Sequence, residues 1–281
     1  MIRISEKEIR EAVAGLCIEA NIHLRPDVLK ALKKALPLEK NHMAKKILNE
    51  LLENAAIAKD TRVALCQDTG MAVVFVEIGR DVDLGGCDIA RAVNSGVEDG
   101  YKRGNLRDSI VSDPILRLKK SGFSPAVIHF DFTRKNGMKL TVLPKGFGCE
   151  NKTALKMFNP TASAEEIEDF IFSVVKKTGP DACPPYVLGV GIGGTSDYAC
   201  QLSKKALLRP IDQRNRLVHV ARMEAAVLKK VNSLNIGPMG LGGKTTALAV
   251  NIDTYPTHIA GLPVAVNVSC HVLRSAAKVL R

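Results

Sequence analysis

Apolar residues follow a helical pattern over the first part of the chain. In the first stretch they recur three or four positions apart, at Ile9, Val13, Leu16 and Ala20. Just before that stripe, Ser5 and Glu8 match the S-x-x-E signature of a capped helix start. Pro26 suits the first turn of a second helix, and a third is expected from about Leu38. The pattern predicts a helical lobe over residues 1–60 that buries apolar faces and carries no chemistry.

From residue 61 onward the apolar positions form short β-type runs separated by helical stretches. The runs expected to be strands cover 71–78, 126–132, 138–143, 186–192, 246–251 and 263–268. Asn136-Gly137, a dipeptide favoured in tight turns, predicts a hairpin between the second and third runs. Helices are expected over 163–179 and about 213–234. This order predicts an α/β (α+β-like) lobe with a mixed sheet over 61–281, within a single domain of 1–281.

The composition is that of an ordinary globular protein of 281 residues, with 46% hydrophobic and 25% charged residues. The 40 Lys and Arg exceed the 29 Asp and Glu, but aromatics are only 4% and no base-reading motif is present. Solvated basic faces therefore explain the charge better than nucleic-acid binding, and a small dianionic substrate also suits it. No apolar run is long enough to cross a bilayer, and the amino terminus lacks the apolar core of a signal peptide. We expect a cytoplasmic protein without membrane contact.

Three cysteines stand in irregular segments next to Gly, Pro, Asp or His: Cys66, Cys183 and Cys270. Cys66 precedes an expected strand, Cys183 lies between an expected helix and strand, and Cys270 follows a strand. An α/β scaffold gathers its sites from such strand-end loops. Thiolates from distant segments can hold one iron–sulfur cluster, and three of them leave one iron of a four-iron cluster open as a Lewis acid. The spacing alone is equally compatible with buried core cysteines.

The other cysteines are assigned to packing. Seven cysteines, an odd number over a long chain, fit a reducing compartment better than a disulfide framework. Cys17 lies on the first apolar stripe, and Cys87 and Cys200 fall in a glycine-containing loop and an expected helix. Cys149 is not expected to be a fourth ligand, because a fourth thiolate would close the open iron.

Several sequence words, all in one order, resemble those of the iron–sulfur-dependent class I fumarases and the related L-tartrate dehydratases. The matching words are Cys66-Gln67-Asp68-Thr69-Gly70, Asn105-Leu106-Arg107, Pro144-Lys145-Gly146, Glu150-Asn151-Lys152, Ala182-Cys183-Pro184-Pro185, Gly193-Gly194-Thr195, Gly237-Pro238-Met239-Gly240-Leu241-Gly242-Gly243-Lys244-Thr245 and Ser269-Cys270-His271. The similarity runs from about residue 10 to the end of the chain. One departure is local: the family more usually shows a glycine and a serine where this chain has Phe147 and Cys149.

The resemblance implies a hydro-lyase that reversibly hydrates fumarate to L-malate, a step of the tricarboxylic acid cycle, on a [4Fe-4S] cluster. The implied residues are Cys66, Cys183 and Cys270 as metal ligands, Asp68 and His258 as catalytic groups, and Gln67, Arg107 and Gly148 at the substrate. Arg107 suits bidentate binding of a carboxylate, and Asp68 suits proton transfer. His258 matches a family histidine that lies close to such an aspartate.

The resemblance also implies a partner. Class I fumarases have a second domain with a threonine base, further arginines and a lysine, whereas this chain ends 11 residues after Cys270 (281 − 270). We therefore expect the chain to be the alpha subunit of a heterodimer with a separate beta subunit, assembled as (αβ)2. L-tartrate is the competing substrate, since it differs from malate by one hydroxyl.

Two other classes of protein stay open. Gly242-Gly243-Lys244-Thr245 looks like the end of a phosphate-binding P-loop, but the pattern needs glycine where Pro238 stands, and the segment follows a helix and opens a β-like run. The glycines at 189, 191, 193 and 194 likewise miss the dinucleotide spacing, and close approach to a cluster or substrate is an alternative reason for them. A non-catalytic cysteine-rich scaffold or activator subunit is the remaining alternative.

Overall fold

The computed structural model describes residues 1–117 and 120–281 and confirms the mixed α/β class. The chain forms two compact units. Unit 1 comprises 1–25, 55–147 and 274–281, and unit 2 comprises 26–54 and 148–273. The first 60 residues are therefore shared between the units, whereas the sequence pattern led us to expect one helical lobe.

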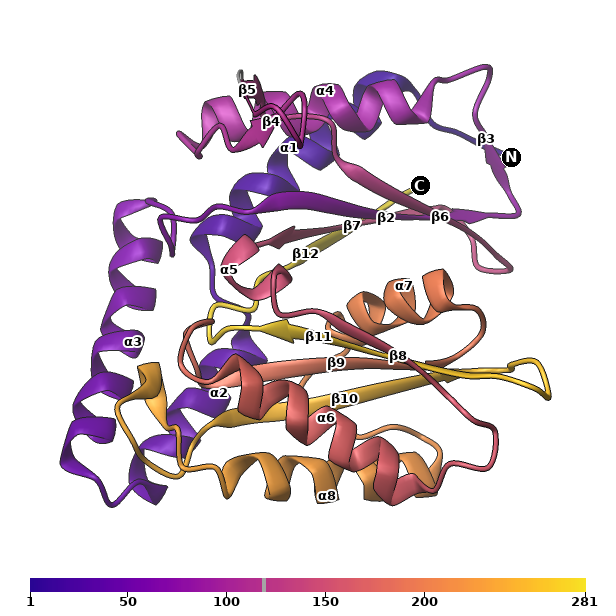
Figure 1. Ribbon diagram of the computed structural model, residues 1–281. Helices are drawn as coiled ribbons and strands as arrows, with labels where there is room; N and C mark the ends of the chain where they lie inside the picture. The colour runs from indigo at the N-terminus through magenta and orange to yellow at the C-terminus, as the bar shows by residue number, and fades with distance from the viewer. Residues whose placement is uncertain (118–119) are drawn as a thin grey trace. The chain divides into compact units, whose positions relative to one another are not determined.

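Unit 1 is built on a four-stranded sheet in the order β12-β7-β2-β6 (Figure 1). Its strands are β2 (Met71–Gly79), β6 (Val127–Thr133), β7 (Met138–Lys145) and β12 (Ala276–Leu280). Two short pairs, β1 (Ile2–Arg3) with β3 (Val82–Asp83) and β4 (Ile110–Val111) with β5 (Lys120–Gly122), complete its strands. Helices α1 (Glu6–Ile22) and α4 (Ile89–Arg103) pack on the sheet and form the core of this unit with it.

The expected hairpin between 126–132 and 138–143 is wrong. β2 lies between the two strands, parallel to β6 and antiparallel to β7. The reason is burial: seven of the nine residues of β2 are buried, so this strand needs a hydrogen-bonded neighbour on each side. Asn136-Gly137 still lies in the tight connection, where Gly137 has φ 79°.

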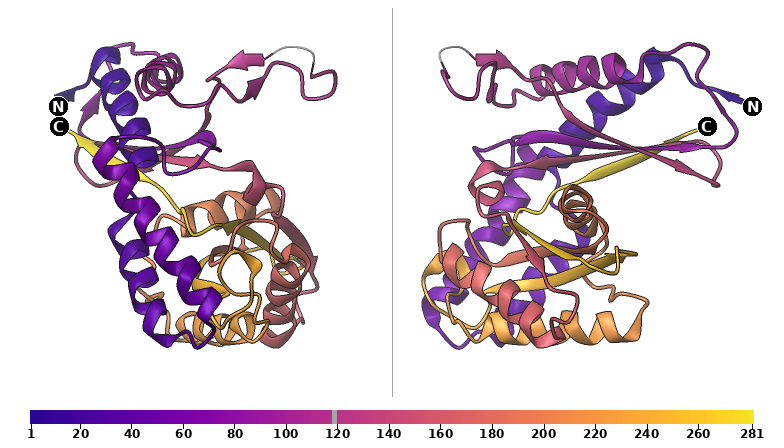
Figure 2. Two further views of the ribbon diagram at one scale, coloured as in Figure 1. Left: turned by 90° about the vertical axis from the view of Figure 1, so that its left-hand side faces the viewer. Right: turned by 45° about the vertical axis from the view of Figure 1, so that its right-hand side comes forward.

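Unit 2 is built on a second four-stranded sheet, in the order β10-β9-β11-β8. Its strands are β8 (Ala154–Phe158), β9 (Tyr186–Gly193), β10 (Ala247–Tyr255) and β11 (Leu262–Ser269). Its helices are α2 (Pro26–Ala35), η1 (Leu36–Leu38), α6 (Ala164–Thr178), α7 (Ser196–Ala206), α8 (Val218–Asn232) and η2 (Pro238–Gly240). Helix α7 covers one face of the sheet, and α6 and α8 cover the other (Figures 1 and 2). Two further helices, α3 (His42–Thr61) and α5 (Phe147–Glu150), contain two of the four points where the chain passes between the units.

The glycines of β9 have a structural explanation. A Cβ on Gly189 would lie 2.1 Å from the Ser203 carbonyl oxygen, and one on Gly191 would lie 2.2 Å from that of Ala199. Both oxygens belong to α7, so these glycines allow the helix to pack directly on the strand. Close approach is confirmed as their role, but the approaching group is a helix and not a cluster or substrate.

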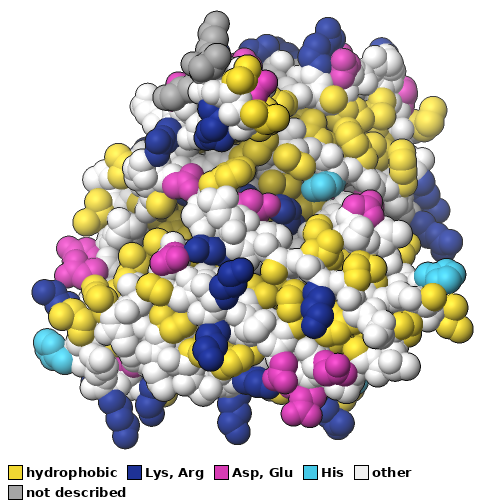
Figure 3. Space-filling model, viewed as in Figure 1, with side chains coloured by type: hydrophobic (Ala, Val, Ile, Leu, Met, Phe, Trp, Pro, Cys, Tyr) yellow, Lys and Arg dark blue, Asp and Glu magenta, His cyan; other side chains and the backbone are white. Residues whose placement is uncertain are grey.

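Local helix signals are confirmed where they were strongest. Ser5 with Glu8 and Ser163 with Glu166 form reciprocal capping boxes at the starts of α1 and α6. No helix in the described part of the chain is long and apolar enough to cross a membrane. On the face shown in Figure 3, Lys and Arg side chains are scattered among acidic and apolar ones rather than gathered into one basic patch.

Candidate functional site

The loop that carries Cys66 leads into β2 in unit 1, and hydrogen bonds to Asp68 hold this loop in place. The Asp68 carboxylate accepts hydrogen bonds from the backbone N–H groups of Gly70 (2.9 Å) and Phe147 (2.8 Å). Its carbonyl oxygen accepts a hydrogen bond from Arg274 Nη2 at 2.5 Å. One residue thus ties together three segments that are distant in the sequence. Asp68 is held in a defined orientation, with Cys66 and Gln67 immediately before it.

Arg107 is brought to the same loop. Its backbone N–H donates to Thr69 Oγ1 at 3.0 Å, and the Tyr101 hydroxyl donates to the carbonyl oxygens of Thr69 (3.1 Å) and Gly70 (3.0 Å). Burial raises the pKa of the Tyr101 hydroxyl, so it stays a neutral donor. The Arg107 side chain is exposed. The structure therefore brings the backbone of Arg107 to the loop that contains Gln67 and Asp68.

In unit 2 the segments of Cys183 and Cys270 come together. Cys183 has φ 56° and precedes a cis bond between Pro184 and Pro185. Its carbonyl oxygen lies 3.1 Å from His271 Nδ1 and accepts a hydrogen bond from the His271 backbone N–H at 3.4 Å. Because a carbonyl can only accept, Nδ1 is the donor in this hydrogen bond. His271, only 9% exposed, thereby joins the loop of Cys183 to the end of β11, where Cys270 lies.

The glycine-rich loop (237–245) supports the Cys183 segment from its other side. The Met239 N–H donates to the Pro184 carbonyl oxygen at 2.7 Å. Farther along, the N–H groups of Lys244 (2.9 Å) and Thr245 (2.6 Å) donate to the carboxylate of Glu39, which is 1% exposed. The amides that would cradle a phosphate in a P-loop are therefore bound to a carboxylate of the same chain. Since a strand and not a helix follows the loop, the geometry argues against the nucleotide-binding alternative.

The cysteines divide into two groups. Cys17 is buried between α1 and α4, where burial raises the pKa of its thiol to about 12. Cys149 is buried in unit 2, and its thiol donates to the Ala182 carbonyl oxygen at 3.4 Å. Burial also raises the pKa of the Cys87 and Cys200 thiols. Cys17 and Cys149 thus lie in the buried cores of the two units, and the packing role expected for Cys87 and Cys200 stays a prediction.

Accessibility does not separate the three predicted ligands from all of these cysteines, because Cys87 and Cys200 are also half-buried. Cys66 and Cys270 are half-buried, Cys183 is exposed, and none of them forms a disulfide. Partly accessible thiols in irregular segments are a donor set that fits an iron–sulfur cluster. Among residues 1–117 and 120–281, no three side chains of His, Cys, Asp or Glu lie close enough together to hold a metal ion. The ligand role of the three cysteines stays a prediction.

Two further predicted site residues lie in less connected places. Gly148 is in α5, next to Phe147, and a Cβ added to it would meet no atom within 4 Å. His258 lies in the exposed turn between β10 and β11, where its Nδ1 accepts the Ala260 N–H at 3.1 Å. The eight residues of β11 separate this turn from Cys270, a distance of roughly 25 Å. Their roles at a substrate also stay predictions.

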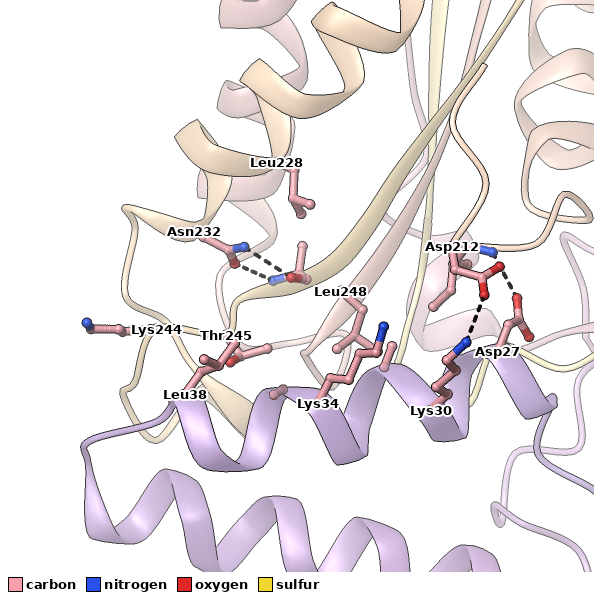
Figure 4. A pocket seen from close by; sticks show the side chains of 14 residues that line it. Asp27, Lys30, Lys34, Leu38, Asp212, Leu228, Asn232, Lys244, Thr245 and Leu248 are labelled. Atoms are coloured by element: carbon pink, nitrogen blue, oxygen red, sulfur yellow. Dashed lines mark hydrogen bonds and ion pairs between the residues drawn. The ribbon is translucent and has the colours of Figure 1, made fainter. Parts of the chain in front are cut away.

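Unit 2 also contains a pocket of about 460 Å³ beside α2 (Figure 4). At its rim, Lys30 pairs with Asp212 at 3.6 Å. The Asn232 side chain, also in its lining, is held by the backbone of Thr246 and Ala247. No residue that the sequence words place at metal or substrate lines this pocket. It is therefore not the candidate site.

Sequence reasoning assigned no role to three residues that organise these loops: Glu39, His271 and Arg274. His271 stands in a matching word, which was the only signal available for it. Arg274 and Glu39 each contact a residue 206 positions away, so no local pattern could have revealed them.

The chain is a mixed α/β protein whose predicted site residues lie in loops of unit 1 (Cys66, Asp68 and Arg107) and in loops of unit 2 (Cys183 and Cys270). The family model described as fumarate hydratase (Fumerase) matches residues 10–279, and the chain belongs to this family.

Its relatives are similar over nearly their whole length. The putative L(+)-tartrate dehydratase subunit alpha of Methanocaldococcus jannaschii is 39% identical over 276 residues, which cover 96% of this chain and 97% of the relative. The L(+)-tartrate dehydratase subunit alpha of Escherichia coli K12 is 29% identical over 266 residues, which cover 94% and 88%.

Proposed function

We propose that the chain is the alpha subunit of a two-subunit hydro-lyase that reversibly hydrates fumarate to L-malate. The observation that carries this proposal is the family match over residues 10–279. The names of the relatives, each a subunit alpha of a dehydratase, support both the reaction class and a separate partner. We further propose an (αβ)2 assembly in the cytoplasm.

The proposed cofactor is a [4Fe-4S] cluster held by Cys66, Cys183 and Cys270. When bound by three thiolates, such a cluster supplies an open iron that acts as a Lewis acid on a substrate hydroxyl. The two loops of unit 2 support this ligand set, because His271 holds the backbone of Cys183 beside the segment of Cys270. The burial of Cys149 and its bond to Ala182 support leaving it out of the ligand set.

Asp68 is the proposed proton carrier of this chain. Oδ1 accepts the Gly70 N–H and Oδ2 accepts the Phe147 N–H, so the carboxylate cannot rotate without losing both bonds. Each oxygen keeps a lone pair that can take up or release a proton. Arg107 would bind a substrate carboxylate with its exposed guanidinium, and Gln67 and Gly148 would contact the substrate nearby.

His258 requires a different arrangement. Since β11 separates it from Cys270 by roughly 25 Å, His258 cannot reach a substrate bound at Cys270 of its own chain. In the proposed (αβ)2 assembly it would act in the site of the second copy. The partner subunit would supply the base that removes the carbon-bound proton.

L-tartrate dehydration is the second candidate reaction, favoured by the names of both relatives. Malate and tartrate differ by one hydroxyl, so a direct comparison decides between them. The chain is co-expressed with its partner, purified without oxygen and assayed with fumarate, L-malate and both tartrate enantiomers. The proposal expects the highest kcat/KM with fumarate or L-malate, and the second candidate expects it with L(+)-tartrate. Turnover of none of the four would overturn both.

A further inference from the structure

Arg274 is a buried cation in the first residues after the chain returns to unit 1. It stands four positions after Cys270 and just before β12, and it is 4% exposed. Its Nη2 donates to the Asp68 carbonyl oxygen. Its Nε and Nη1 are buried and have no hydrogen-bond partner among the residues that the structure describes.

This arrangement is unusual because an arginine side chain stays charged in proteins. A guanidinium carries five N–H donors, and the contact with Asp68 uses one. Buried charges are normally paired, since a charge without a partner loses its hydration and receives nothing in return. Arg274 has no ion pair in the described part of the chain. An acceptor from outside the chain would satisfy it.

Arg209 in unit 2, in contrast, is paired with carboxylates of the same chain. Its Nη2 forms ion pairs with Glu224, which is fully buried, and with Asp253 at 3.6 Å. The chain thus provides carboxylates for Arg209, whose side chain is 17% exposed, and not for the more deeply buried Arg274.

The carboxylate of Asp68, the proposed proton carrier, and Nη2 of Arg274 both lie close to Gly146. A Cβ on Gly146 would lie 3.1 Å from Asp68 Oδ2 and 3.6 Å from Arg274 Nη2, so a side chain there would crowd both groups. The Asp68 carboxylate is held by Gly70 and Phe147 and forms no ion pair with the guanidinium. The buried Nε and Nη1 of Arg274 therefore still lack an acceptor within the described ranges of the chain, and a second carboxylate would supply one.

We propose that Arg274 binds one carboxylate of the small dicarboxylate substrate and holds it beside Asp68. This inference rests on the proposed function for the identity of the ligand. The planar guanidinium can donate two parallel N–H bonds to a carboxylate, a geometry that an ammonium group does not reproduce. Arg274 and Arg107 would then hold the two ends of the substrate on either side of the Asp68 loop. An acidic side chain of the partner subunit is the other source of a carboxylate.

The test measures binding of succinate, an unreactive dicarboxylate, to the α–β complex by isothermal titration calorimetry. The variants are Arg274→Gln, Arg274→Lys and, as a control at a half-buried arginine with carboxylate partners, Arg209→Gln. Loss of a charge-assisted bidentate contact should weaken succinate binding about 10- to 100-fold in Arg274→Gln, with Arg274→Lys in between. KM should rise more than kcat falls. Arg209→Gln should lower the Tm and leave succinate binding unchanged.

Wild-type succinate affinity in both folded Arg274 variants would overturn the inference, whatever their Tm. If Arg274→Gln weakens assembly with the partner and leaves succinate binding intact, the occupant is a carboxylate of the partner and the substrate assignment fails. Succinate binding does not require turnover, so the proposed function is tested separately. Wild-type protein that binds succinate but does not hydrate fumarate would contradict the proposed function and leave the Arg274 inference standing.

Discussion

Replacing Glu39 with glutamine should destabilise unit 2, because this carboxylate organises the glycine-rich loop. Glu39 is 1% exposed, and its two oxygens accept the N–H groups of Lys244 and Thr245 at 2.9 and 2.6 Å. In Glu39→Gln one oxygen becomes an NH2 group that faces a backbone donor. At least one of the two hydrogen bonds is lost, and the remaining one no longer has a charged acceptor.

The size of the effect follows from these two bonds. A hydrogen bond to a charged group contributes about 1.5–3 kcal/mol, and a buried donor left unpaired adds its own desolvation cost. We expect the free energy of unfolding to fall by about 2–4 kcal/mol in Glu39→Gln. Urea unfolding followed by circular dichroism measures this change, with an unchanged slope against denaturant if the transition stays two-state.

A local readout separates this cause from general damage. The amide hydrogens of Lys244 and Thr245 should lose protection against exchange in Glu39→Gln, while those in the core of β11 keep it. Glu166→Gln is the control, because Glu166 also accepts a backbone N–H, from Ser163, but does so on the surface. Its effect on unfolding should be clearly smaller. A Glu39→Gln protein with the stability and exchange pattern of Glu166→Gln would refute the reasoning.

Three further predictions follow from the packing and the ionisable groups. Iodoacetamide should label Cys183, which is exposed, in the folded, metal-free chain, whereas Cys17 should react only on unfolding, because it is buried and its thiol pKa is raised to about 12. Peptide mass spectrometry measures the labelling, and labelling of Cys17 at the rate of Cys183 would contradict the prediction. Gly100→Ala should destabilise unit 1 by about 1–3 kcal/mol in urea unfolding, because the added Cβ would lie 2.7 Å from the Ala14 carbonyl oxygen. If the variant is as stable as the wild type, α1 and α4 are not packed this closely. Burial raises the pKa of Asp253 above its unfolded value, partly offset by Arg209, so the folded state binds this proton more tightly and the free energy of unfolding should fall as the pH rises through the raised pKa. Asp253→Asn should remove that part of the pH dependence, and an unchanged profile of unfolding free energy against pH would count against this prediction.

The parts of the fold that depend on neighbouring residues could be predicted from the sequence. Ser5 with Glu8 and Ser163 with Glu166 bind each other within one helical turn, so the sequence alone predicts both helix starts. Strand pairing is not local in this way. Asn136-Gly137 favours a turn, but the burial of β2 determines which strands pair, and no short window contains that information.

In the candidate site, too, some residues could be predicted from local sequence words and others act only through long-range contacts. Cys66, Asp68 and Arg107 stand in words that resemble a known family, and the structure brings the Asp68 and Arg107 segments together. Arg274 and Glu39 act through partners 206 positions away. A single sequence gives no sign of such contacts, since each residue is an ordinary charge until the fold buries it.

The most direct test of the central claim is the iron and sulfide content of the α–β complex purified without oxygen, measured with its visible absorption. The account predicts about four iron and four sulfide per α chain in the wild type and in Cys149→Ser. It predicts loss of the cluster in Cys66→Ser, Cys183→Ser and Cys270→Ser, with the metal-free proteins still folded. A full cluster in all three of these variants, or none in the wild type, would contradict it.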